Sequence, residues 1–273
     1  LINSQITKEA IRRVSIITKL FGHPVELVSG VAAKSMEDAT NFRLMGQKNV
    51  VPIGEFRFDQ QIPERHVLSG NSALSVVNQK KRSVIGFSSV IFGEADIYIN
   101  CMKSLKEFSL EKGLQKPLYV FVPRAPEAFG DIFKKIEEAG LSVVRRSESF
   151  SDDLNPNTSI DWNNIDVLLG DSFGEMYFYL KLCDHVVAGG GFWHTGAHNI
   201  IEQLQLHKPV TVGPEIWTIK FPALQAEEAG LLKVVKDPAE LKSDLILFLE
   251  SNIADKISRN KFEGFLKVYA GAS

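Results

Sequence analysis

The stretch H-V-V-A-G-G-G-F-W-H-T-G-A-H-N-I-I-E-Q-L-Q-L, residues 185–206, decides the fold. It opens with the apolar run 185–188, which is typical of a buried strand, passes through three glycines, and ends with helical periodicity over 199–206. The same order of strand, loop and helix recurs on both sides of it. Predicted strands cover 84–87, 118–122, 142–145, 167–169, 210–212 and 232–235, and predicted helices cover 94–112, 127–139, 175–182, 223–229, 238–251 and 254–269. This alternation predicts an α/β protein with a doubly wound, Rossmann-like parallel sheet.

The pattern is different before residue 84. Spacing of apolar residues predicts a helix over 7–20 and short strands at 25–28 and 50–53. Ser35 followed by Asp38 resembles a capping box and predicts a helix over 35–44. Residues 60–82 are polar and weakly patterned, and they are interpreted as a linker or a crossing between domains.

Composition excludes several classes of protein. The chain has 273 residues, 44% of them hydrophobic and 23% charged, as in ordinary globular proteins. The net charge of −2 gives no global attraction to nucleic acid, which is not expected as a partner. Two cysteines are too few for a disulfide scaffold, and no apolar run reaches the ~18 residues of a membrane span. The chain begins Leu1-Ile2-Asn3, like the middle of a domain, so we expect a fragment or a trimmed chain.

Most unusual residues follow predicted strands. They occupy 88–93, 123–126, 170–175, 189–202 and 213–214. Ligands of parallel sheets bind at the carboxyl ends of strands, so these five loops predict one composite site.

The loop 189–202 is the most informative of the five. Its glycines let backbone approach a ligand, and a helix beginning near Asn199 would favour an anion such as phosphate. Glu202 could accept hydrogen bonds from ribose hydroxyls. A plain glycine turn with an Asn cap and an exposed Glu explains the pattern equally well, and the spacing is not that of a dinucleotide fingerprint. His194 and His198 are four residues apart, but a third ligand is missing, so a loop role is favoured over metal binding.

Three further loops carry polar residues. The 170–175 loop, G-D-S-F-G-E, is an ordinary helix cap or a second ligand contact. Arg124, between two prolines, suits a phosphate or a base carbonyl, and it is otherwise a surface residue. Ser88 and Ser89 either bind phosphate or satisfy turn backbone.

These loops, in this order, resemble the 3-deoxy-D-manno-octulosonic acid (Kdo) transferases, which are inverting glycosyltransferases of the GT-B fold. The family typically has V-P-R-H-P-E, G-D-T-M-G-E and G-G-H-N-P-L-E, where this chain has V-P-R-A-P-E at 122–127, G-D-S-F-G-E at 170–175 and T-G-A-H-N-I-I-E at 195–202. Residues 35–39 resemble S-E-E-D-A, and 54–59 resemble G-N-L-K-F-D. The chain departs from the family's pattern at Gln5, Arg57, Val90, Ala125 and Ile200.

The resemblance implies transfer of Kdo from CMP-Kdo to a lipid A precursor in lipopolysaccharide biosynthesis, at the cytoplasmic face of the bacterial inner membrane. It implies that residues 1–59 are the tail of an acceptor domain and 60–273 the donor domain, the C-terminal half of a GT-B protein. The catalytic base and the segment that approaches the membrane would lie outside this chain. No metal or cofactor is implied.

The resemblance also implies site residues. Arg57 would stabilise the transition state. The residues around the donor nucleotide would be Pro123, Arg124, Phe173, Gly174, Glu175, Asn199, Ile200, Ile201 and Glu202. Supporting residues would be Ser89, Gly93, Glu94, Gly190, Gly191, Gly196 and His198. Two alternatives stay open: a degenerate or truncated relative without activity, and a GT-B transferase that uses another nucleotide sugar.

Overall fold

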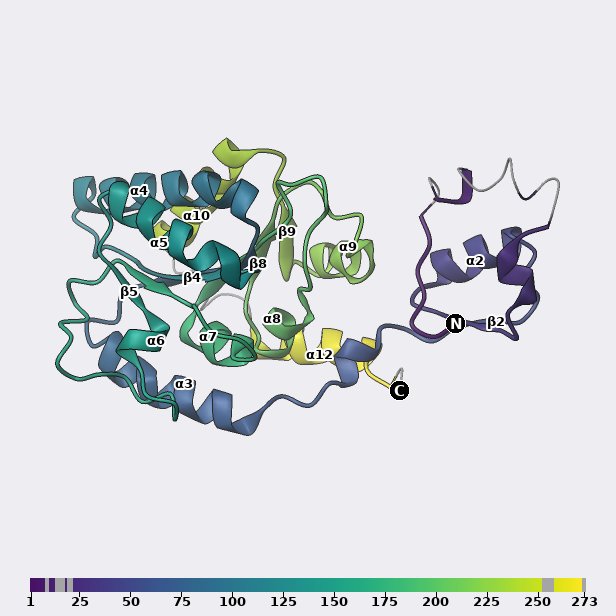
Figure 1. The fold of residues 1–273 in the computed structure, drawn as a ribbon, viewed down its shortest axis with the longest axis horizontal. Coiled ribbons are helices and arrows are strands. Elements are labelled where there is room, and N and C mark those ends of the chain that lie inside the picture. The colour runs from purple at the N-terminus through teal and green to yellow at the C-terminus, as the bar shows by residue number, and fades with distance from the viewer. Residues whose placement is uncertain (8–9, 13–17, 19–21, 252–257, 272–273) are drawn as a thin grey trace. The chain divides into compact units, whose positions relative to one another are not determined.

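The computed structural model describes residues 1–7, 10–12, 18, 22–251 and 258–271. The chain divides into two compact units (Figure 1). Unit 1 comprises Leu1–Gln61 and Gly264–Ser273, and unit 2 comprises Ile62–Glu263. The predicted helix over 7–20 lies largely outside the described residues.

Unit 1 is a small α/β layer. Strands β1 (Val31–Ala33) and β2 (Val50–Pro52) pair in parallel, and helix α2 (Met36–Leu44) connects them. Ser35 caps α2 by accepting a hydrogen bond from the Asp38 N–H at 3.0 Å, which confirms the predicted helix start. The predicted strand at 25–28 is wrong: Pro24–Leu27 form a 3-10 helix, η1, because proline at its first position presets a helical φ.

Unit 2 contains a seven-stranded sheet in the order β5-β6-β4-β3-β7-β8-β9, and every pairing in it is parallel. The expected doubly wound fold is confirmed. The central strands are buried on both faces, as helix-covered parallel strands are. The strands are β3 (Val84–Val90), β4 (Leu118–Pro123), β5 (Val143–Arg145), β6 (Val167–Leu169), β7 (His185–Ala188), β8 (Val210–Val212) and β9 (Leu232–Val234).

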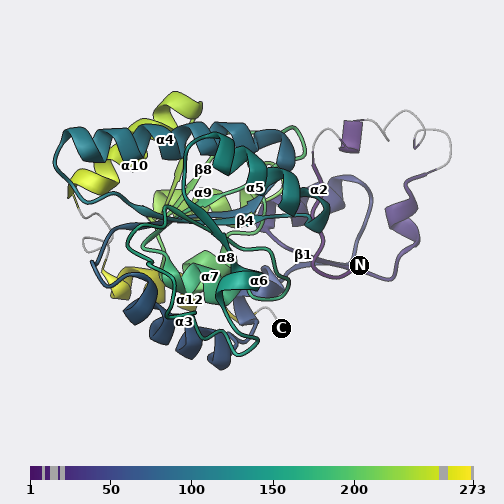
Figure 2. The ribbon, with the colours of Figure 1, turned by 60° about the vertical axis from the view of Figure 1, so that its left-hand side comes forward.

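Helices cover both faces of this sheet (Figures 1 and 2). Helices α4, α5 and α10 pack on one face around Tyr98, Met102 and Ile132. Helices α3 and α7 pack on the other around Phe178. The helices are α3 (Glu64–Val77), α4 (Ala95–Glu111), α5 (Phe129–Glu138), α6 (Arg146–Ser149), α7 (Met176–Leu182), α8 (Ile201–Gln205), α9 (Lys220–Glu228), α10 (Pro238–Ser251) and α12 (Arg259–Tyr269). Short 3-10 turns are η2 (Phe56–Asp59), η3 (Phe92–Glu94) and η4 (Pro126–Ala128).

The interpretation of residues 60–82 as a linker is wrong, because most of them form helix α3, whereas the expected crossing between domains does fall there, at Gln61–Ile62. Its buried residues are Gly70, Ala73 and Val77, which lie on one face at helical spacing. A Cβ on Gly70 would lie 2.7 Å from the Lys181 side chain, so α3 and α7 approach closely. Small residues make this stripe weakly apolar, which explains why hydropathy fails to reveal it.

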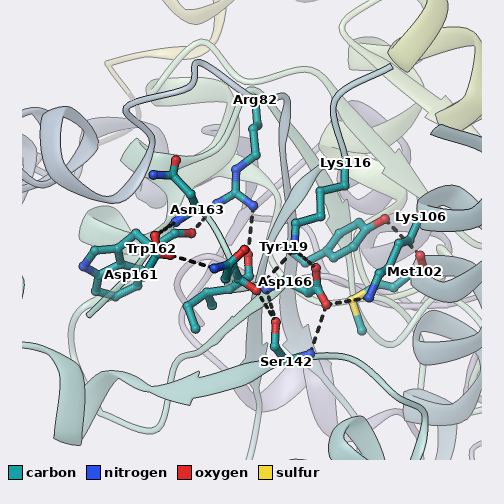
Figure 3. Close-up of polar contacts among 12 residues, drawn as sticks. Arg82, Met102, Lys106, Lys116, Tyr119, Ser142, Asp161, Trp162, Asn163 and Asp166 are labelled. Atoms are coloured by element: carbon teal, nitrogen blue, oxygen red, sulfur yellow. Dashed lines mark hydrogen bonds and ion pairs between the residues drawn. The ribbon is translucent and has the colours of Figure 1, made fainter. Parts of the chain in front are cut away.

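A polar cluster joins the amino ends of four strands (Figure 3). Asp166, which is 2% exposed, forms ion pairs with Lys106 at 2.8 Å and Lys116 at 2.6 Å, and accepts from the Ser142 N–H. Burial alone would raise the pKa of Asp166, but hydrogen bonds from both lysines bring the net pKa below its ordinary value. Buried Arg82 donates to the carbonyls of Ile165 and Trp162. The cluster fastens the edge of the sheet opposite the loops discussed next.

Candidate functional site

The chain order of the strands reverses between β3 and β7. From β3 the chain continues to β4 on one side, and it later returns to add β7 on the other side. In open parallel sheets, ligands bind at the carboxyl edge beside such a reversal. The segments leaving that point are 91–94, after β3, and 189–200, after β7.

Glu94 binds these two segments together. Its carboxylate accepts four hydrogen bonds, from the backbone N–H groups of Ile91, Gly190 and Phe192 and from the Tyr98 hydroxyl. The side chain is fully buried, and burial raises its pKa, although these hydrogen bonds oppose the rise. Glu94 therefore supports the segment 189–200, called the glycine loop below. Because its side chain is fully buried, neither of its oxygens is available to a ligand.

The glycine loop packs against neighbouring backbone. A Cβ on Gly191 would lie 2.5 Å from the Gly213 nitrogen, and one on Gly93 would lie 2.5 Å from the Trp193 ring. At Gly190, φ is +85° and a Cβ would overlap the carbonyl oxygen of Gly196. Larger residues would push these loops apart, so close packing requires glycine at the expected supporting positions Gly93, Gly190 and Gly191.

Ser88 and Ser89 lie in β3 rather than in the loop where they were expected. The pairing of β3 with β4 shifts between Phe87 and Val90, and Ser89 takes a left-handed conformation with φ +55°. The buried Ser88 hydroxyl accepts a hydrogen bond from Gln203 Nε2 at 3.0 Å. Ser88 therefore anchors α8 to the sheet.

Helix α8 begins at Ile201, two residues later than expected, and has five residues. Asn199 precedes it, and its Oδ1 accepts from the Ile201 N–H at 3.2 Å. Asn199 therefore stands one residue before the N-cap position, which Ile200 occupies without a side-chain cap, so the predicted Asn cap is not present. Ile200 and Ile201 are buried, so any ligand contact they make is through backbone.

Arg124 follows β4 at the same edge of the sheet. Its N–H donates to the Val90 carbonyl at 2.8 Å, which joins the ends of β3 and β4, while its side chain is exposed. Pro123 before it is buried. Burial and, second to it, the positive charge of Arg124 lower the pKa of His198. The charge of Arg124, after β4, therefore acts on His198 in the loop after β7.

The loop after β6 is fastened by a residue that the sequence analysis missed. Arg146, which is 6% exposed, donates through Nη2 to Glu175 Oε1 at 2.6 Å. The other Glu175 oxygen accepts from the hydroxyls of Ser172 and Tyr179. The sequence could have indicated this role of Arg146, since it is a charged residue directly after strand β5. Contact of Glu175 with a nucleotide stays a prediction.

Phe173 is held out from this loop. Its side chain is 68% exposed, and its ring centroid lies 6.3 Å from the ring centroid of Phe129. Gly174 follows with φ +76°, a conformation that turns the chain sharply after the phenylalanine. An exposed aromatic ring at the carboxyl edge is suited to packing on a flat ligand group such as a nucleobase.

Glu202 and Arg57 belong to different units, and a role of either in the site stays a prediction. Glu202 lies in the first turn of α8, near Tyr177, where burial first and the Glu202 charge second raise the tyrosine pKa to about 12. Arg57 belongs to η2 of unit 1, whereas the other site residues belong to unit 2, so its role stays a prediction.

The described residues hold neither a cluster of metal ligands nor a membrane-spanning helix. No three His, Cys, Asp or Glu side chains lie together as metal ligands would in the described part of the chain. Among the same residues, no helix combines the length and apolar character needed to span a bilayer.

No model of a known protein family matches the chain. Curated proteins named 3-deoxy-D-manno-octulosonic acid transferase do match most of it. The protein from Bordetella pertussis is 28% identical over 230 residues, or 84% of this chain and 51% of that protein. The protein from Aquifex aeolicus is 24% identical over 259 residues, or 95% of this chain and 64% of that protein. The chain spans about half the length of the first relatives it matches.

Solved structures show the same architecture. The C-terminal CMP-Kdo binding domain of WaaA from Acinetobacter baumannii matches with a TM-score of 0.62 and 20% identity, over 74% of this chain and 98% of that one. Anabaena Alr3699/HepE in complex with UDP matches with a TM-score of 0.53 and 14% identity, over 98% of this chain and 65% of that one. The chain is therefore similar in sequence to the 3-deoxy-D-manno-octulosonic acid transferases over most of its length, and unit 2 has a seven-stranded parallel sheet like that of its GT-B glycosyltransferase neighbours.

Proposed function

We propose that this chain is the donor-binding part of a glycosyltransferase that transfers Kdo from CMP-Kdo in lipopolysaccharide biosynthesis. The observation that carries the proposal is the joining of the β3 and β7 loops by Glu94 at the reversal of strand order. The sequence relatives bear the Kdo transferase name, and the solved WaaA domain is named for CMP-Kdo binding.

Different residues of unit 2 bind the phosphate, the base and the ribose of the nucleotide. The exposed Arg124 supplies positive charge for the phosphate. Phe173 packs on the base, and Glu202 accepts hydrogen bonds from the ribose hydroxyls. Departure of CMP leaves negative charge on the phosphate, which Arg124 stabilises, with Arg57 as a second candidate. We assign no residue of this chain as the base that deprotonates the acceptor hydroxyl.

The remaining parts of the proposal concern the acceptor. Residues 1–59 form the tail of the acceptor domain and 60–273 the donor domain. The acceptor is a lipid A precursor, and the protein works at the cytoplasmic face of the bacterial inner membrane, near which an N-terminal region outside this sequence brings it. The alternatives are a non-catalytic relative and a transferase for another nucleotide sugar.

Calorimetric titration of the 273-residue chain with CMP tests the donor assignment. We expect CMP to bind, with UMP and GMP binding at least about tenfold more weakly. Arg124→Ala and Glu202→Ala should each weaken CMP about tenfold or more, as loss of one charge-assisted hydrogen bond does. The matched control is Glu127→Ala, an exposed carboxylate near Arg124 in sequence. Equal binding of all three nucleotides would favour a different donor, and binding of none would refute the proposal.

A further inference from the structure

The polar side chains of the loop 170–175, after β6, bind other groups of the protein. The Glu175 carboxylate accepts from Arg146 Nη2 at 2.6 Å through one oxygen. Through the other oxygen it accepts from the hydroxyls of Ser172 and Tyr179. Because protein donors engage both oxygens, the carboxylate fixes the shape of its own loop.

A second link joins the same loop to the start of α6. Asp171 accepts from the Ser147 N–H at 2.8 Å and from the Ser147 hydroxyl at 2.6 Å. The Arg145 guanidinium lies 3.8 Å from the same carboxylate. Residues 145–147, where β5 passes into α6, therefore hold the loop at two places, through Asp171 near its start and Glu175 at its end.

Phe173 lies between these two links. Its side chain is exposed, while Asp171 and Glu175 on either side of it are bound to the protein. The ring has a neighbour in Phe129, at the start of α5. An exposed group contacts a ligand precisely when the structure around it fixes its position. The two links are that structure for Phe173.

Arg146 is buried and directed at Glu175, so it is not placed to touch a ligand. Its Nε is buried without a partner among the described residues. A buried ion pair adds little net stability, because the loss of hydration of both charges offsets their attraction. What Arg146 does supply is a fixed place for Glu175 and hence for the loop.

We propose that Arg146 is a positioning residue, which through Glu175 holds Phe173 in place to pack on the base of the donor nucleotide. The inference rests on the proposed function, in which Phe173 packs on the base. Glu175 also acts through the loop and not by direct contact with the nucleotide. The affinity for CMP should therefore depend on Arg146 as long as Phe173 is present, and lose that dependence without it.

A double-mutant cycle measured by calorimetry with CMP tests this. Phe173→Ala should weaken CMP binding about tenfold, as loss of one aromatic ring stacked on a base does. Arg146→Met should weaken it by up to about tenfold, but by less than about twofold in a chain that already carries Phe173→Ala, because residues that act through one another are not additive. Arg146→Lys keeps the positive charge beside Glu175 and should bind CMP within about threefold of the unchanged chain.

Arg82→Met is the matched control, because Arg82 is a buried arginine of unit 2 at the opposite edge of the sheet. It should lower the temperature of unfolding and leave the affinity for CMP unchanged, which separates the position of the loop from stability. Asp171→Ala removes the second link and leaves Arg146 in place. It should show the same non-additivity with Phe173→Ala, and it decides the matter should Arg146→Met fail to fold.

Three results would overturn the inference while the donor assignment stands. They are an Arg146→Met variant that binds CMP as tightly as the unchanged chain, a loss that is equal with and without Phe173, and a Phe173→Ala variant of unchanged affinity. In each case the unchanged chain still binds CMP. If the unchanged chain binds no nucleotide, the proposed function fails and the inference fails with it.

Discussion

The four hydrogen bonds to Glu94 make one buried carboxylate responsible for the shape of the glycine loop. An ionised carboxylate is an acceptor at both oxygens, so it suits a place where every neighbour is a donor. A glutamine has nearly the same shape, but its NH₂ group would face backbone N–H groups. The residue is therefore specified by hydrogen-bond polarity and not by size.

Glu94→Gln should lower the free energy of unfolding by about 2 kcal/mol, because buried donors lose a charged acceptor. It should also weaken CMP binding, since the loop loses its support. Urea denaturation and calorimetry measure the two effects. The control is Glu107→Gln, an exposed glutamate of α4, the helix that begins directly after Glu94, and an unchanged stability of Glu94→Gln would contradict the supporting role.

A second buried polar cluster links β7, β8 and β9 to helix α10. His185 in β7 lies 2.8 Å from the Thr211 hydroxyl in β8, which donates to Asp244 of α10 at 2.6 Å. Lys233 of β9 pairs with the same carboxylate at 2.8 Å. Because the threonine proton goes to Asp244, the hydroxyl can only accept from His185, which fixes the proton of the neutral ring on Nε2.

The buried His185 makes the free energy of unfolding depend on pH. Burial lowers the pKa of His185 to about 4, despite the opposing charge of Asp244. The unfolded chain binds this proton below ~6.5, so stability is full above that pH and falls as the pH approaches 4, by roughly 3 kcal/mol. His185→Gln should flatten the dependence between pH 6.5 and 4 in chemical denaturation. His194→Gln should leave it, and a His185→Gln profile as steep as the original would refute the assignment.

Some elements follow from sequence pattern and others do not. The strands around 118–122 and 185–188 are long apolar runs and were predicted closely, whereas α3 was missed because its buried face is made of Gly70 and Ala73. The start of α8 was placed at Asn199 because asparagine is a usual cap. The structure places Asn199 before the cap position, since Ile200 occupies it.

At the scale of the whole molecule, the chain crosses between its two units more than once. Helix α12 begins in unit 2 and ends in unit 1. Within unit 1, Phe58 contacts Phe265 at 6.1 Å and Tyr269 at 5.8 Å between ring centroids, and the Gly271 N–H donates to Asp59 at 2.6 Å. Residues 264–271 therefore belong to unit 1, where they pack against η2.

Separate cores predict separate unfolding. Phe265→Ala should lower the temperature of one calorimetric transition, because it removes a ring that is 7% exposed in unit 1, at a cost of about 3 kcal/mol. Ile132→Ala, in the core of unit 2, should lower the other transition instead. A single transition moved equally by both variants would show that the units unfold together.

The parallel sheet and the edge that carries the site could be predicted from sequence, because alternation and strand-end loops are local signals. The order of the strands could not, since nothing local says that β7 joins β3 on the side away from β4. The contact of Glu94 with Gly190 joins residues 96 positions apart, and the Arg146–Glu175 pair spans 29. Contacts between residues so far apart in sequence depend on the order of the strands. The loops of the site can therefore be predicted from sequence, whereas the residues that support them cannot.

Trp193 packs against Gly93, so its fluorescence can report on the site. The chain has three tryptophans. Trp193 lies against the segment that Glu94 binds, and Trp217 lies against Gly196, whereas Trp162 is buried beside Arg82 at the opposite edge. Emission from the first two should change when a ligand displaces the water around the glycine loop, over a constant background from the third. Ligand binding at the site can therefore be measured by tryptophan fluorescence, without labelling the protein.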